Sequence, residues 1–195
     1  ADAVLPQLER HWRASDGAFP RSVRAVEVAH LALAATTPAA NLLNDATTSA
    51  ALFLFHSQKD ARQALDTLLQ PAMQRLKAQA APASASLLLV SADCAKLLGE
   101  VAVLNQVLDA CTGLEGDAFT MGSVLLRRGD RQSTLCNKDL AHAAFTQAEA
   151  HFEKAGAIRE RAIALGKIAD IHYFRGDLDE ALRIRIEEQL PVFEK

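Results

Sequence analysis

The chain has 195 residues and a formal net charge of −3; half of its residues are hydrophobic and 23% are charged. This composition is typical of a globular protein, and the small net charge provides no basic field that would attract nucleic acid or a membrane surface. Three cysteines without a CxxC pair argue against a disulfide framework and favour a reducing, cytoplasmic setting. No secretory signal and no bilayer-length apolar stretch is present, so we expect no membrane segment.

Apolar residues recur at three- and four-residue spacing along the chain, which predicts an all-α protein of about ten helices. In chain order we expect helices over residues 2–15, 21–36, 40–57, 60–79, 84–98, 100–111, 115–128, 138–155, 158–175 and 178–194. Prolines in the first, fourth and last of these predict kinks or shifted helix ends: Pro6, Pro71 and Pro191.

Turn residues separate these helices without a long linker, so we expect one continuous array over residues 1–195. The turn signals are Asp16-Gly17, Pro38, residues 81–84, Thr112-Gly113, residues 129–137, Gly156 and Gly176-Asp177. Between Val28 and Gln58 the only charged residue is Asp45, so this region should be buried or covered. Because the chain starts without methionine and ends within an expected helix, we interpret it as part of a longer protein.

The clearest local pattern is a helix, a Gly-Asp turn and a second helix over residues 165–193. Gly176 suits the left-handed position that ends a helix, and Asp177 with Glu180 resembles a capping box. The small residues Ala169 and Ala181 would allow the two helices to cross closely. An apolar stripe then follows the second helix, formed by Leu178, Leu182, Ile186, Leu190 and Phe193.

This segment resembles a tetratricopeptide repeat, in which large, small and aromatic residues precede a turn glycine and an early alanine in the second helix. The matching positions are Leu165, Ile168-Ala169, His172-Tyr173, Gly176 and Ala181. Arg185 departs from the family at its later aromatic position, and the second helix is longer than the family period allows. A second copy places Asp139-Leu140 and Ala143 38 residues before Asp177-Leu178 and Ala181. The first helix of this second copy matches the first helix of the clearer copy at a separation of 47 residues, through Ala118, Met121-Gly122, Leu125 and Gly129-Asp130. The difference between 47 and 38 predicts a loop insertion near residues 131–138.

The resemblance is specific over residues 115–195 and weak before residue 84, where the helices are divergent. It implies a right-handed superhelical solenoid of antiparallel helix pairs with a concave groove lined by first helices. It further implies that the groove is lined by Phe119, Ser123, Leu126, Arg127, Lys167, Asp170, Tyr173 and Phe174. An alternative interpretation of Tyr173 and Phe174 is that they pack against a neighbouring repeat.

Other motifs give little indication of chemistry. Two Arg-Gly-Asp tripeptides, at residues 128–130 and 175–177, fall at equivalent repeat positions and are interpreted as turns. Six histidines form neither HExxH nor an i, i+4 pair, so we expect no metal site, and no phosphate-binding glycine loop occurs, so we expect no cofactor. We interpret Cys94 and Cys111 as small buried residues, whereas Cys136 should be exposed in the inserted loop.

We therefore expect a non-enzymatic scaffold that binds a partner peptide or helix. An alternative is a sensor or regulatory segment of a larger signalling or NTPase-type protein, where the repeats contact an effector or other domains of the same polypeptide. A hydrolase using Cys136 or a histidine is the weakest hypothesis. The last helix should also present an apolar face through which self-association is possible.

Overall fold

The computed structural model describes residues 1–15, 18–112, 114 and 116–194, and it is built from helices and turns throughout those ranges. Helices account for 81% of the residues, with no strand among the described ones, which confirms the predicted all-α class. The turn signals at residues 16–17, the signal at Gly113 and the helix start expected at residue 115 lie outside the described residues.

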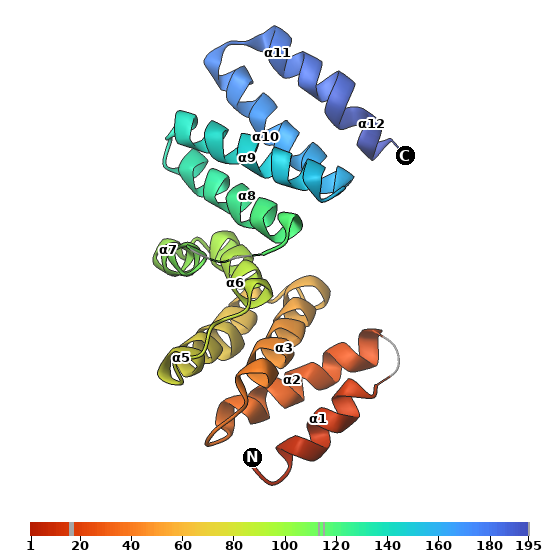
Figure 1. The fold of residues 1–195 in the computed structure, drawn as a ribbon, viewed down its shortest axis with the longest axis vertical. Coiled ribbons are helices and arrows are strands. Elements are labelled where there is room, and N and C mark those ends of the chain that lie inside the picture. Colours follow the sequence, from red (N-terminus) through yellow and green to blue (C-terminus); the bar gives the residue numbers. More distant parts are fainter. Residues whose placement is uncertain (16–17, 113, 115, 195) are drawn as a thin grey trace. The chain divides into compact units, whose positions relative to one another are not determined.

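The chain forms two compact units, one ending at Cys111 and the other beginning at Thr112, called here the N-terminal and C-terminal units. The helices of the N-terminal unit are α1 (Leu5–Arg13), α2 (Ala18–Ala34), α3 (Ala40–Leu52), α4 (Ala61–Gln63), α5 (Gln70–Ala78), α6 (Ala85–Leu98) and α7 (Val101–Ala110) (Figure 1). A wide π-helical turn, Phe53–Ser57, extends α3, and another, Ala64–Leu69, joins α4 to α5.

In the N-terminal unit, α2 packs against α1 and α3, α3 also packs against α5 and α6, and α6 packs against α7. The charge-poor segment supplies the core between α2 and α3, where Val28, Leu43 and Ala50 are completely buried. The expected burial of this segment is therefore confirmed. Trp12 of α1 is buried as well, and its indole N–H donates to the carbonyl oxygen of Arg21 at 3.1 Å.

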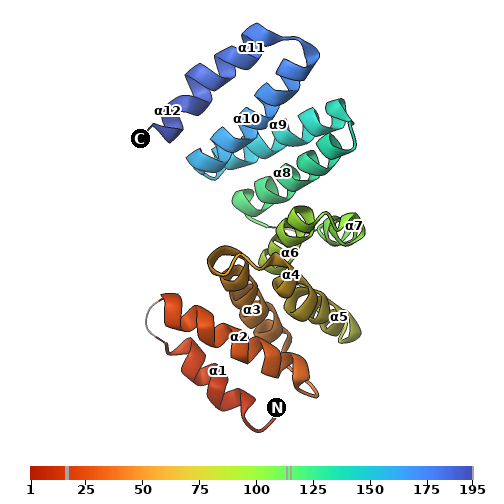
Figure 2. The same cartoon turned by 180° about the vertical axis from the view of Figure 1, so that it is seen from behind.

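The C-terminal unit contains α8 (Ala118–Thr134), α9 (Lys138–Lys154), α10 (Ile158–Arg175), α11 (Leu178–Arg183) and α12 (Leu190–Phe193). A π-helical turn, Ile184–Gln189, joins α11 to α12 just before Pro191, so the described part of the chain has ten continuous helical segments, as predicted. Helix α9 packs between α8 and α10, and α10 packs against α11–α12, as both views show (Figures 1 and 2).

The same turn closes α6, α8, α9 and α10. After α8, the N–H of Cys136 donates to the carbonyl oxygen of Ser133, and the N–H of Asn137 donates to that of Gln132. The N–H of Lys138 then donates to the carbonyl oxygen of Cys136. The same three hydrogen bonds recur around the other turn residues, and all four have a positive φ: Gly99 (71°), Cys136 (60°), Gly156 (66°) and Gly176 (90°). This left-handed position is one that favours glycine, and Cys136 occupies it at a steric cost.

The matching turns lie 40 residues apart, at Cys136 and Gly176, and α8 and α10 likewise begin 40 residues apart, at residues 118 and 158. The separations of 38 and 47 residues inferred from the sequence are therefore wrong. So is the expected insertion at residues 131–138, because α8 continues to Thr134. The buried equivalent of Ala181 is Ala141, whereas Ala143 is exposed.

The Arg-Gly-Asp tripeptide at residues 128–130 is not a turn either, because it lies inside α8; only the tripeptide at 175–177 forms one. Gly129 is buried where α8 crosses α9, and a Cβ atom there would lie 2.4 Å from Cε1 of Phe145. Seven residues earlier, a Cβ atom at Gly122 would lie 2.8 Å from Cε1 of Phe152. Two glycines of α8 thus receive two phenylalanine rings of α9, which allows close approach of the two helices.

Candidate functional site

The groove predicted from the repeat resemblance falls on α8 and α10. On α10, the Lys167 ammonium lies 3.1 Å from the carboxylate of Asp130 on α8, and Asp170 pairs with Arg185 on the last helix. Tyr173 and Phe174 are 60% and 67% exposed. This face of α10 therefore combines charges already engaged within the unit with two aromatic rings open to solvent.

The two rings are held at the end of α10 by their neighbours. Tyr173 and Phe174 meet edge to face with ring centroids 5.7 Å apart. The Lys138 ammonium lies 5.5 Å from the Phe174 ring centroid and 3.4 Å from its carbonyl oxygen. A cation over a ring face stabilises both groups, so the start of α9 fixes the orientation of Phe174.

The four α8 residues predicted to line the groove have different environments. Phe119 is 45% exposed and touches the Phe152 ring edge-on at 5.9 Å. Ser123 is buried, and its carbonyl oxygen accepts a hydrogen bond from the half-buried Arg127 guanidinium at 2.9 Å. Leu126 is partly buried and packs into the apolar core of the unit. The structure thus brings together the α10 residues, but does not place Ser123 or Leu126 on an open surface.

The 40-residue register identifies three α8 residues that sequence reasoning missed. Arg127, which was predicted, is the equivalent of Lys167, whereas Asp130, Ser133 and Thr134 are the equivalents of Asp170, Tyr173 and Phe174. Asp130 carries the ion pair with Lys167, and Ser133 and Thr134 are exposed. The signal that could have found them is the turn at residues 135–137, which Cys136 conceals because it stands where glycine is usual.

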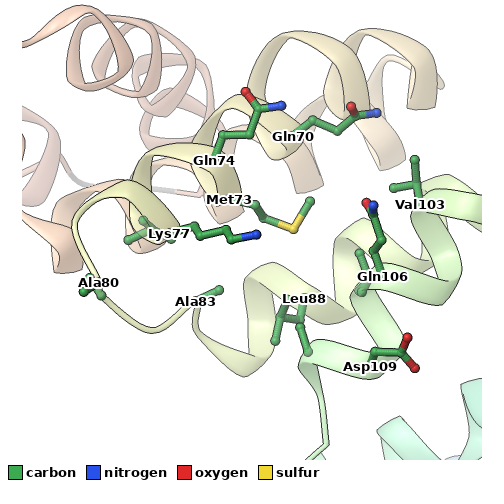
Figure 3. Close-up of a pocket in the computed structure, with 14 residues that line it drawn as sticks. Gln70, Met73, Gln74, Lys77, Ala80, Ala83, Leu88, Val103, Gln106 and Asp109 are labelled. Carbon is green, nitrogen blue, oxygen red and sulfur yellow. The ribbon is translucent and has the colours of Figure 1, made fainter.

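A second candidate site, not predicted from the sequence, is a cleft of about 810 Å³ in the N-terminal unit. Helices α5 and α7 form its walls, and α6 with the preceding loop forms its base, as Figure 3 shows. The walls approach each other where Gln70 lies near Val103, and they diverge toward Lys77 on one side and Asp109 on the other. The cleft is therefore a wedge that opens outward.

The lining of the cleft is apolar at its base and polar at its rim. Met73, Leu76, Leu88, Val103 and Val107 provide the apolar surface. Glutamine amides stand on both walls, from Gln70 and Gln74 on α5 and Gln106 on α7. An amide can both donate and accept hydrogen bonds, and Met73 adapts its unbranched side chain to different shapes. This combination suits an amphipathic ligand.

Hydrogen bonds hold the walls of the cleft in place. Near the end of α5, the Arg75 guanidinium donates to the carbonyl oxygens of Leu33 and Ala35 at 2.7 and 2.8 Å, so it caps α2. The loop before α6 is held by Asn44, whose amide donates to the carbonyl of Pro82 at 3.2 Å and accepts from the N–H of Ser84 at 2.7 Å. The cleft is thus a preformed feature of the unit.

Two histidines lie close together where α9 meets α10. The rings of His142 and His172 lie 5.4 Å apart, and His172 Nδ1 is 3.4 Å from Asp177. Among the described residues no group of three potential metal ligands occurs, and no helix there is long and apolar enough to cross a bilayer. Burial raises the pKa of the Cys94 thiol to about 12, the opposite of what a nucleophile requires. Cys136 is exposed, as expected, but in a turn instead of an inserted loop.

Comparison with known proteins gives no match: no family model, curated protein or solved structure matches this chain. The tetratricopeptide resemblance and the function therefore stay proposals, and both rest on the residues described above.

Proposed function

We propose that this protein is a tetratricopeptide-type helical-repeat scaffold, a right-handed solenoid of helix pairs that binds a helix of a partner protein. The observation that carries the proposal is the cleft between α5 and α7. Its lining residues along α5 run from Gln70 to Lys77, which corresponds to roughly 10 Å of helix. This length accommodates about two turns of a docked helix.

The chemistry of the cleft favours an amphipathic helix as the occupant. Its apolar base would receive side chains spaced at i, i+3 or i+4 and i+7, as in helix-in-groove complexes. Lys77 and Asp109 flank the mouth on opposite sides, so a partner with an acidic residue facing Lys77 and a basic residue facing Asp109 would dock in one direction. The wide, exposed rim favours a macromolecular partner over a fully enclosed ligand.

A second candidate function is sensing of a small effector, in line with a regulatory segment of a larger protein. The volume of about 810 Å³ lies within the range of small-molecule pockets, roughly 300–1,000 Å³. The apolar base with three amides resembles such pockets in composition. An effector would bind without the charge register that Lys77 and Asp109 provide, so the two functions predict different responses to mutation of these residues.

The test begins with helical peptides selected from a displayed random library, whose binding is measured by fluorescence anisotropy. Ala110→Trp fills the cleft and should weaken binding at least tenfold, whereas Ala143→Trp, on an exposed face of α9, should leave it unchanged. Lys77→Glu should reverse the charge preference of the selected peptides. Selected peptides that bind wild type and Ala110→Trp equally would contradict the proposal.

A further inference from the structure

The last helix of the C-terminal unit presents large apolar side chains to solvent. Three of them, called here the anchor residues, are about half exposed: Ile186 (53%), Leu190 (47%) and Phe193 (49%). They follow the spacing i, i+4 and i+7, which is the spacing that a helix uses when it docks in an apolar groove. The end of this chain thus carries the kind of surface that the cleft of the N-terminal unit suits.

The anchor residues match the cleft in length. Ile186 and Phe193 are seven residues apart, as are Gln70 and Lys77, between which α5 lines the cleft. Each interval corresponds to roughly 10 Å of helix. All three anchor residues can therefore lie over the apolar base of the cleft at the same time.

The charges beside the first anchor residue match those at the mouth of the cleft. Arg185 and Glu187 flank Ile186 on opposite sides, because successive helical residues point about 100° apart. Lys77 and Asp109 stand on opposite sides of the wide end of the cleft (Figure 3). With Ile186 at this end, one orientation of the helix brings Glu187 to Lys77 and Arg185 to Asp109. Opposite charges then meet on both walls, which fixes the direction of docking.

Both charged residues of the last helix are free to change partners. Arg185 pairs with Asp170, and the side chains of both residues are about half exposed. Glu187 lies 3.5 Å from Arg183, and its side chain is 64% exposed. Exposed ion pairs add little to stability, so exchanging them for pairs across an interface costs little.

We propose that the cleft of one copy of this chain binds the last helix of a second copy, with Ile186, Leu190 and Phe193 over its apolar base. The proposal rests on the proposed function, because it names the partner of the same cleft. The two surfaces in contact differ, so the copies join head to tail. Docking of about two helical turns buries a small area, so the association is weak and depends on concentration.

The first test is sedimentation velocity of the full chain at increasing concentration, in which the sedimentation coefficient should rise. Ala110→Trp, which fills the cleft, and Leu190→Glu, which places a charge among the anchor residues, should each leave a monomer. An equal mixture of these two variants should form a dimer and nothing larger, because it combines one intact cleft with one intact helix. Leu140→Glu, an equally exposed leucine of α9, is the matched control and should associate like the parent chain.

The second test uses a labelled peptide of residues 178–194, whose binding to the full chain is measured by fluorescence anisotropy. Ala110→Trp should weaken binding at least tenfold. The Lys77→Glu chain should prefer the peptide carrying Glu187→Lys over the parent peptide.

A chain that stays monomeric at every concentration would overturn the proposal. So would an Ala110→Trp chain that associates like the parent, because the last helices would then pair with each other. If peptides from the random library bind the cleft and the 178–194 peptide does not, this inference fails and the proposed function stands. If neither kind of peptide binds, both fail.

Discussion

Replacing Gly129 by alanine tests the close packing of α8 on α9. The added Cβ would lie 2.4 Å from Cε1 and 2.5 Å from Cδ1 of Phe145, well inside the 3.0 Å that real Cβ atoms keep. Phe145 is only 1% exposed, so its ring has no open space into which it could turn. Either the ring or the helix must therefore move by about 1 Å to restore ordinary contact.

Two effects of opposite sign determine the change in the free energy of unfolding. Alanine favours a helix interior over glycine by about 1 kcal/mol, whereas overpacking a dense core costs about 1–3 kcal/mol. Because Phe145 is enclosed, we expect the upper part of that range and a net loss of about 1–2 kcal/mol for Gly129→Ala. Gly122→Ala should cost less, since its Cβ would lie farther from the Phe152 ring, at 2.8 Å.

The assay is urea denaturation followed by circular dichroism, arranged as a double-mutant cycle with Phe145→Leu. Removing the ring opens the space that the new methyl group needs, so Gly129→Ala should become neutral or stabilising in that background. The coupling energy between the two sites should be at least about 1 kcal/mol. Additive effects, or a Gly129→Ala variant as stable as wild type, would refute the inferred contact.

Further predictions concern turns, core and titration. Cys136→Gly should raise stability by about 0.5–1 kcal/mol in denaturant melts, because Cys136 has a φ of 60° in a turn position that is otherwise glycine. Ala181→Leu should cost about 1–3 kcal/mol, since Ala181 is 4% exposed; a wild-type Tm would contradict the close crossing. Burial, assisted by the nearby Arg175, lowers the pKa of His142 below its usual 6.5. As the pH drops below about 6.5, the unfolded state therefore binds a proton before the folded state does, and the free energy of unfolding should fall. This pH dependence should flatten in His142→Gln. A maleimide should label Cys136 quickly and leave Cys94 unlabelled until the protein unfolds.

Most helices were predictable because their signals are local. The starts of α9, α10 and α11 at Lys138, Ile158 and Leu178 coincide with the expected ones, since amphipathic spacing and turn glycines act over a few residues. The π-helical turn before Pro191 also follows from local chemistry, because proline lacks the N–H that would continue regular helical bonding.

The register of the repeat could not be predicted in this way. Gly129 looks like a turn residue next to an aspartate, but it is helical because the Phe145 ring occupies the space beside it. Cys136 looks unlike a turn residue, yet it takes the left-handed conformation. Both errors come from interactions between helices, which outweigh local preference and moved the expected turn by seven residues.

The cleft was not predictable for a related reason. Its volume depends on how α5 and α7 diverge over α6, and no spacing within a single helix encodes that angle. The candidate groove on α10 was accessible to sequence reasoning only because the turn at Gly176 fixes its register directly. A site that one helix presents can therefore be predicted once its turn is known, whereas a site between three helices requires the packed structure.

The length of the repeat unit connects these observations. Helices α8 and α9 have 17 residues each and α10 has 18, so each hairpin with its turns spans 40 residues, compared with about 34 in a tetratricopeptide repeat. The residues that resemble the family, from Leu165 to Ala181, cluster on either side of the Gly176 turn. The additional residues therefore lie toward the ends of the helices away from that turn, where Arg161 reaches Glu149 at 2.5 Å. Ion pairs of Arg161 with Glu149 and Glu153 at these far ends thus extend the α9–α10 interface beyond the part that the family pattern describes.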